Sequence, residues 1–110
     1  MNIPKVGKLR ESEARLLVLQ IAATFPGHSA STTEIKRAVP SYRELTAADL
    51  LPSSTRANEH MWEQIIGNAT GSHGPSSVSI FNKGYATKTT NGIKVTEKGI
   101  AHLKNKGLYE

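Results

Sequence analysis

The stretch Tyr85-Ala-Thr-Lys-Thr-Thr-Asn-Gly-Ile-Lys-Val-Thr-Glu-Lys-Gly-Ile-Ala-His-Leu103 decides the expected fold of this chain. Two strand-like runs flank Asn91-Gly92, the dipeptide that best suits a two-residue type I′ hairpin turn because both residues tolerate positive φ. The second run leads directly into Thr96, whose hydroxyl can cap a short closing helix. We therefore expect a β-hairpin followed by a helix in this part of the chain.

The composition is that of a small, basic, single-domain protein. With 110 residues, the chain can build one modest core and not two. The formal charge of +5 and the pI of about 9.7 suit a polyanionic partner. The positive charge is concentrated late in the sequence, because residues 80–106 contain six lysines and a single acid, Glu97.

Several classes of function are disfavoured by what the sequence lacks. It has no cysteine, which excludes disulfides, thiol nucleophiles and cysteine-based zinc sites. The four histidines show no metal-ligand spacing, and neither a Gly-x-Ser-x-Gly elbow nor a phosphate loop is present. We therefore expect no enzyme activity, no cofactor and no metal. Because no apolar run reaches the roughly 20 residues that span a bilayer, and no signal-peptide stretch begins the chain, we expect a cytoplasmic protein, associated with the nucleoid when bound to DNA.

The N-terminal segment is predicted to contain an arm and one buried helix. Residues 1–10 lack periodicity and are expected to be a flexible arm. Ser12 is the predicted cap of a helix that runs to about Thr24, and its apolar residues fall on most sides, which indicates a central position. Pro26-Gly27 is expected to end this helix.

A short strand and a second helix are expected next. Residues 28–31 can form one small strand. Either Thr32 or Thr33 is then predicted to cap a helix that continues to Val39, and Pro40 is predicted to stop it.

The middle of the chain is predicted to hold a long connector and a third helix. Residues 40–54 form the connector, with one helical turn at 46–50. The third helix is expected from about Thr55 to Asn68, followed by a segment, residues 76–83, that fits either a strand or a helical turn. One face of the third helix carries an apolar stripe of Met61, Trp62, Ile65, Ile66 and Ala69. The tryptophan is expected in the core.

The opposite face of the predicted third helix is the recognition candidate. Arg56 and Gln64 have donor patterns that match guanine and adenine edges in the major groove of DNA. The alternative is an ordinary solvated polar face, and the acidic Glu63 counts against simple phosphate binding. The predicted outward face comprises Arg56, His60, Glu63, Gln64 and Gly67.

The lysines of the hairpin are the second set of candidate DNA contacts. Lys83, Lys88 and Lys94 could reach phosphates beside a groove and so provide affinity without sequence information. The alternative is a sheet edge that lysines protect against aggregation. Lys36 and Arg37 on the second helix are candidates for similar backbone contacts.

A family resemblance is carried by four segments. They are Leu51-Pro52-Ser53, Trp62-Glu-Gln-Ile-Ile-Gly-Asn68, Ile80-Phe-Asn-Lys-Gly-Tyr85 and Gly92-Ile-Lys-Val-Thr-Glu-Lys-Gly99. In this order they resemble the winged-helix domains found at one end of Mrr-type and HNH-type restriction endonucleases and related defence proteins. The resemblance spans roughly residues 12–103.

The resemblance implies an α+β winged helix-turn-helix, with a three-helix core, a C-terminal hairpin as the wing and a short closing helix. The domain would span residues 11–106, with residues 107–110 as a tail. The implied function is non-catalytic binding of double-stranded DNA, since the catalytic residues of such nucleases are missing. The DNA contacts would be Arg56, Gln64 and Asn68 on the third helix, and Lys88 and Lys94 on the wing.

Alternatives to a DNA-binding monomer remain open. One is a winged helix that docks a protein through its wing or third helix, and another is a small homodimeric transcription regulator. A nuclease or other protein subunit could act as partner. The chain is expected to be either a stand-alone module or a domain excised from a longer protein. If six basic side chains met phosphates, affinity would fall about 10³-fold between 50 and 200 mM salt.

Overall fold

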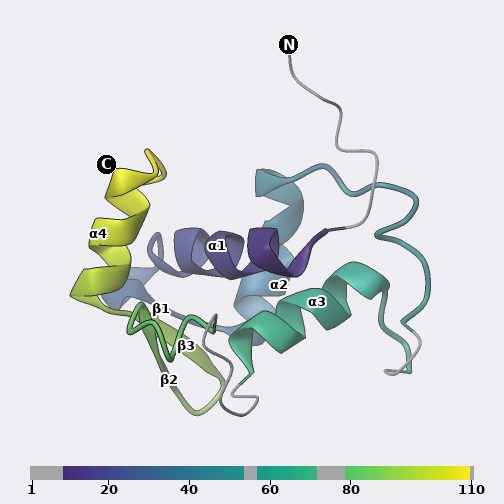
Figure 1. Cartoon of the computed structure of the whole chain (residues 1–110). Coiled ribbons are helices and arrows are strands. Elements are labelled where there is room, and N and C mark those ends of the chain that lie inside the picture. The colour runs from purple at the N-terminus through teal and green to yellow at the C-terminus, as the bar shows by residue number, and fades with distance from the viewer. Residues whose placement is uncertain (1–8, 54–56, 72–78, 110) are drawn as a thin grey trace.

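The computed structural model describes residues 9–53, 57–71 and 79–109. The chain has the expected α+β class, and Figure 1 shows its small sheet at the lower left, below α4 and to one side of the other helices. Besides a 3-10 turn at Pro26–His28, the described elements are α1 (Glu11–Ala22), β1 (Ser29–Ser31), α2 (Thr32–Tyr42), α3 (Met61–Thr70), β2 (Ala86–Lys88), β3 (Gly92–Val95) and α4 (Glu97–Asn105). None of these helices is long and apolar enough to cross a bilayer.

The three strands form one antiparallel sheet in the order β1-β3-β2. Lys94 pairs with Ser29 of β1 and with Thr87 of β2, so these three residues lie on one face, here called the outer face. Because side chains alternate along a strand, the neighbouring residues point the other way, where Ala30 and Ile93 are buried. This inner face closes the core.

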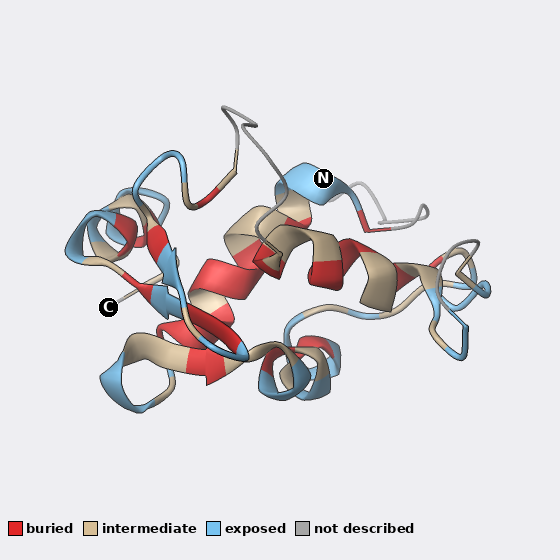
Figure 2. Ribbon diagram, turned by 90° about the horizontal axis from the view of Figure 1, so that it is seen from below, coloured by how far each residue is buried: buried red, intermediate tan, exposed pale blue. Residues whose placement is uncertain are grey.

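Helix α1 lies at the centre of the molecule, as its apolar sequence predicts. It packs against α2, α3, α4 and the sheet, and Figure 2 shows buried residues on it and on the elements around it. The predicted apolar stripe of α3 faces this core, where Trp62 is 8% exposed and Ile66 is fully buried. The buried residues of α1 are Ala14, Leu17, Val18, Leu19, Ile21 and Ala22.

The start of α1 differs from the prediction that Ser12 caps it. The helix begins at Glu11, and the carboxylate of Glu13 accepts a hydrogen bond of 3.0 Å from the backbone N–H of Arg10. The acid in the first turn therefore satisfies the backbone N–H of Arg10, the residue before the helix, whereas a cap at Ser12 would have served an N–H two or three residues after it. Leu9, which belongs to the predicted arm, is 1% exposed and lies in the core, while residues 1–8 are outside the described residues.

Helix α2 is capped by Ser31 rather than by Thr32 or Thr33. The Ser31 hydroxyl accepts from the backbone N–H of Glu34 at 3.0 Å, and the Glu34 carboxylate accepts from the backbone N–H of Ser31 at 2.8 Å. This reciprocal arrangement satisfies two donors at once. The last residue of β1 thus also starts the helix.

Pro40 does not end α2, which continues to Tyr42. Pro40 lacks the N–H that would bond to the preceding turn, but the helix continues past it, and the N–H of Arg43 donates to the carbonyl of Val39 at 3.0 Å. The prediction that Pro40 stops the helix after Val39 is therefore wrong, and the helix is three residues longer than predicted.

Helix α3 begins at Met61, six residues later than predicted. Before it, the chain doubles back in a short antiparallel bridge, in which Ser53 N–H donates to Glu59 and Met61 N–H donates to Leu51. Asn58 has a positive φ of 65° inside this turn. In a helix that began at Thr55, the Glu59 carbonyl and the Met61 N–H would have bonded within the helix. In the structure both groups bond within the bridge instead.

The hairpin turn is centred one residue earlier than Asn91-Gly92. Thr89 and Gly92 close it, since the Thr89 N–H donates to the Gly92 carbonyl at 3.0 Å, which leaves Thr90 and Asn91 at the tip. Neither Asn91 nor Gly92 has a positive φ, so the predicted type I′ turn is not formed. Gly92 is needed for another reason: a Cβ there would overlap the backbone of Ala30 in β1.

The end of the chain follows the sequence prediction closely. The Thr96 hydroxyl accepts from the backbone N–H of Gly99 at 3.1 Å and caps α4, while Leu103 is fully buried. Of the ambiguous segment 76–83, residues 79–83 form a helical turn, with Lys83 N–H bonded to the Ser79 carbonyl, and the remainder lies outside the described residues.

Candidate nucleic-acid interface

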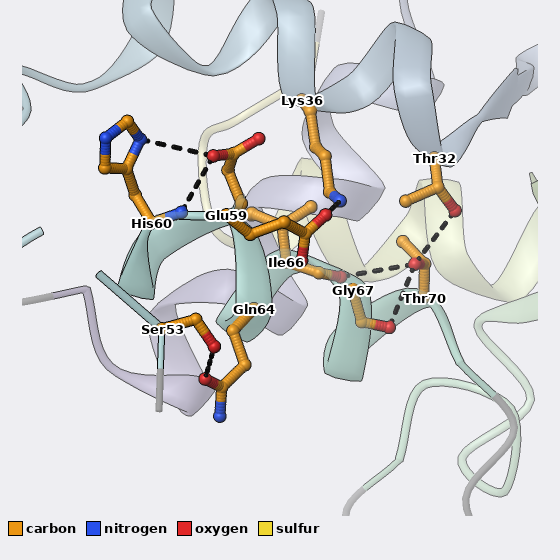
Figure 3. Close-up of polar contacts among 10 residues, drawn as sticks. Thr32, Lys36, Ser53, Glu59, His60, Gln64, Ile66, Gly67 and Thr70 are labelled. Carbon is orange, nitrogen blue, oxygen red and sulfur yellow. Dashed lines mark hydrogen bonds and ion pairs between the residues drawn. The ribbon is translucent and has the colours of Figure 1, made fainter. Parts of the chain in front are cut away.

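Helices α2 and α3 are joined by two polar contacts, shown in Figure 3. The Lys36 ammonium lies 2.7 Å from the Glu59 carboxylate, just before α3 begins. Towards the other end of α3, the Thr32 hydroxyl donates to the Thr70 hydroxyl at 3.0 Å. Lys36, predicted to contact the DNA backbone, is therefore engaged in an ion pair within the protein. Gly67, predicted on the outward face of α3, is buried.

The N-terminal end of α3 carries His60 as its cap rather than as a helical residue. The backbone N–H of His60 donates to the Glu63 carboxylate at 2.9 Å, and its Nδ1 lies 3.2 Å from the same carboxylate. The imidazole is half exposed. This geometry corrects the prediction that His60 lies within the recognition helix, although its ring remains at the helix edge.

Gln64 presents one free polar group on the exposed side of α3. Its Oε1 accepts a hydrogen bond from the Ser53 hydroxyl, and the described residues leave its amide nitrogen without an acceptor, pointing away from Ser53 in Figure 3. Asn68, one turn further along, is partly exposed. Arg56, predicted together with Gln64 to read base edges, lies outside the described residues.

Lys88 ties the hairpin to α3. Its ammonium donates to the backbone carbonyl of Thr70 at 2.8 Å, at the helix end where unpaired carbonyls favour a cation. Lys88 lies on the same side of the sheet as the buried Ala86, two residues earlier in the strand. An ammonium has three donors, so this contact leaves two for another acceptor.

Lys94 lies on the outer face of the sheet and not beside α3. It is exposed between Ser29 and Thr87, its partners on the neighbouring strands. The two lysines predicted to act together on the wing, Lys88 and Lys94, therefore point to opposite faces of the hairpin. Only Lys88 adjoins the candidate recognition helix.

The edge formed by α2, α3 and the hairpin tip carries little net charge. Arg37 is exposed on α2 and forms no ion pair with another described residue. Lys36 is compensated by Glu59, and Glu63 adds a negative charge at the N-terminal end of α3. Hydrogen-bonding groups therefore dominate this edge, which we call the α3 edge: His60, Gln64, Asn68, Arg37, Lys88 and the turn residues Thr89, Thr90 and Asn91.

A buried ion pair fixes the connector that precedes α3. Asp49 is fully buried and accepts from the backbone N–H groups of Leu9 and Thr46, while Arg43 lies 3.2 Å away. Burial alone would raise the pKa of this carboxyl, but the hydrogen bonds from Thr46 and Leu9 and the charge of Arg43 outweigh burial and lower the pKa.

No protein-family model, curated protein or solved structure matches this chain. A function can therefore be inferred only from the sequence and the geometry of the chain. Within the described ranges, no three histidine or acidic side chains lie close enough together to hold a metal ion.

Lys83 lies away from the α3 edge, in a basic hollow that the sequence did not predict. Arg15 of α1 and Lys106, just after α4, line the same hollow. Arg15 lies in the first predicted helix, and Lys106 is one of the six lysines of residues 80–106. No spacing in the sequence relates the two residues, since they are 91 positions apart and only the packing of α1 against α4 brings them together.

Proposed function

We propose that this chain is a winged helix-turn-helix that binds double-stranded DNA without catalysing a reaction. The observation that carries the proposal is the Lys88–Thr70 contact. It holds the hairpin alongside the C-terminal end of α3, in a chain whose elements run α1-β1-α2-α3-β2-β3 with sheet order β1-β3-β2. This order and this neighbourhood are what a recognition helix flanked by a wing requires.

Helix α3 would enter the major groove through its exposed edge. The free amide nitrogen of Gln64 can donate to a base acceptor, while the Ser53 hydroxyl fixes the orientation of the amide. His60 and Asn68 flank Gln64 by about one helical turn on either side, a span suited to reading a few successive base pairs. Such amide contacts supply sequence information rather than non-specific affinity.

Phosphate contacts would come from a small number of cations. Arg37 is exposed on α2, and Lys88 retains two donors beyond its bond to Thr70. Two or three phosphate contacts predict that affinity falls about 10- to 40-fold between 50 and 200 mM salt. This is shallower than the six-contact expectation from sequence, because Lys36 is paired with Glu59 and Lys94 lies on the outer face.

The first test is fluorescence-anisotropy binding to a random duplex of about 20 base pairs, titrated across this salt range. Arg37→Ala should weaken binding and make its salt dependence shallower by about one phosphate contact. The matched control is Lys104→Ala, which removes an exposed lysine of α4. Equal losses in both variants would point to general charge attraction and would contradict an interface at the α3 edge.

The resemblance to restriction-associated domains supports a more specific version of this proposal. The chain would supply DNA binding to a nuclease that acts as a separate subunit or domain. Pull-down of the purified chain with candidate nucleases encoded beside its gene, with and without the duplex, tests this version. If the chain binds DNA but captures no nuclease with or without the duplex, the binding function stands and the coupling to a nuclease is contradicted.

A second candidate function rests on two exposed leucines. Leu50 and Leu51 are 47% and 58% exposed in the connector that leads into α3, a position where a protein partner could bury them. A partner docked there would bind with little salt dependence, and Leu51→Ser would abolish its binding. If Leu51→Ser still binds DNA, the leucine surface and the α3 edge serve different partners.

A further inference from the structure

We infer that the hollow between α1, the turn at residues 79–84 and the end of α4 is a binding site for a small phosphate monoester. It has a volume of about 290 Å³, close to the lower end of the range for small-molecule sites. Three cationic side chains line it, those of Arg15, Lys83 and Lys106. This site is separate from the α3 edge and is independent of the proposed DNA-binding function.

Among the described residues, nothing compensates the positive charge of this hollow. No described carboxylate lines it, and none of its three cations forms an ion pair in the described part of the chain. Elsewhere in the fold, Lys36 and Arg43 each have an acidic partner within 3.2 Å. A bound anion would stabilise a cluster of cations that has no acidic partner. A dianion would offset more of the positive charge than a monocarboxylate would.

The three cations and two hydroxyls suit a phosphate in their donor chemistry. Arg15 is only partly exposed, and its planar guanidinium can bind two oxygens of one phosphate. Lys83 and Lys106 are exposed at the rim and supply point charges. The hydroxyls of Ser12 and Tyr85 are in the lining as further donors.

One wall of the hollow is a stacked ring pair, which gives the site a fixed shape. The rings of Tyr85 and His102 lie 4.2 Å apart and within 10° of parallel, and the ammonium of Lys98 lies 5.8 Å from the centre of the Tyr85 ring. The remaining lining is apolar and comes from α1 and the turn. A phosphate at the rim would thus leave an apolar interior for the organic part of the ligand.

His102 reports on the charge of this site. Burial, followed by the positive charges of Lys106 and Lys83, lowers the pKa of His102. Arg15 on α1 and Tyr85 on the adjacent turn face the same hollow. A phosphate bound among these cations would offset their repulsion, so ligand binding should raise the pKa of His102.

The test is a nuclear magnetic resonance titration of the full chain with glycerol 2-phosphate, and separately with inorganic phosphate. The expected result is saturable shifts at His102, Lys83 and Lys106, together with a higher pKa for His102. Lys83→Ala/Lys106→Ala should weaken binding at least tenfold. The matched control, Lys94→Ala/Lys104→Ala, removes two exposed lysines elsewhere and should bind the ester as the unmodified chain does. The folded state of each variant is checked by its circular dichroism spectrum.

Three results would overturn the inference. The first is shifts that rise linearly without saturation, and the second is equal weakening in the two double variants. The third is a hollow that responds to a DNA duplex but not to glycerol 2-phosphate, since this would assign its cations to the nucleic-acid backbone. Failure of DNA binding at the α3 edge would leave the phosphate titration unaffected, so the two proposals fail independently.

Discussion

The ammonium of Lys88 donates a 2.8 Å hydrogen bond to the carbonyl oxygen of Thr70, and so joins β2 to the last turn of α3. The two residues are 18 positions apart, with residues 72–78 between them outside the described part. This contact fixes where the hairpin lies relative to the candidate recognition helix. It also gives Lys88 a role within the fold, beside the two predicted from the sequence, which were a phosphate contact and protection of the sheet edge.

Removing the Lys88 ammonium should loosen the hairpin. We predict that Lys88→Met lowers the free energy of unfolding by about 0.5–1 kcal/mol, the range for a cation at a solvent-accessible helix C-terminus. Lys94→Met removes an equally exposed lysine from the outer face and should change stability by less than about 0.5 kcal/mol. Urea denaturation followed by the fluorescence of the single tryptophan measures both. Equal effects would show that the Thr70 contact contributes nothing of its own.

Loss of the buried carboxylate of Asp49 should be far more damaging. Asp49→Ala takes away the closer acidic partner of the Arg43 guanidinium, whose other carboxylate, Glu13, lies 3.9 Å away, and removes an acceptor from two backbone N–H groups. We expect a loss of about 3 kcal/mol in the free energy of unfolding, as for other broken buried ion pairs. Glu44→Gln, at a neighbouring exposed position, is the control and should be close to neutral in the same denaturation experiment.

The same carboxyl predicts an acid-dependent loss of stability. Its folded-state pKa is lowered below the ordinary value of 3.8, so its contribution is complete above 3.8 and is lost as pH falls through the lower folded-state value. The stabilities of the unmodified chain and of Asp49→Ala should therefore converge as the pH falls below about 4. A difference that stays constant across this range would contradict the assignment.

Gly92 is predicted to tolerate no side chain. A Cβ at this position would overlap the Ala30 oxygen and press on Ser31, so β1 would have to move away from β3. Gly92→Ala should cost at least about 2 kcal/mol, as expected for a backbone displacement at a packed position. Thr90→Ala, at the exposed tip of the same turn, should be nearly neutral. Hydrogen-exchange measurements should show that the amides of β1 lose protection in Gly92→Ala.

The parts of the fold that were predicted correctly depend on local chemistry. Thr96 caps α4 because its hydroxyl reaches an N–H only three residues away, and the apolar period around Ile66 identifies the buried face of α3 from ten consecutive residues. Both signals are complete within a short stretch, of about one helical turn for the cap and about three for the apolar period. Such signals can be read without knowing the tertiary structure.

The incorrect predictions arose where a distant segment decides the local conformation. Gly92 was assigned to a turn, whereas the close passage of β1 requires its small size. The start of α3 was set too early because nothing near residue 55 indicates the bridge between Pro52 and His60. The candidate site residues were predicted least well. Lys36, predicted to contact DNA, forms an ion pair with Glu59, which is 23 positions away.

The measurement that most directly tests the central proposal is mapping of backbone amide shifts as a short duplex is added to the isotope-labelled chain at low salt. A winged helix that reads DNA through the α3 edge predicts the largest shifts at residues 60–70 and 88–92 and at Arg37, with α1 little changed. Shifts confined to α4 and the turn at 79–84, or no shifts with the protein folded, would contradict DNA binding by the α3 edge.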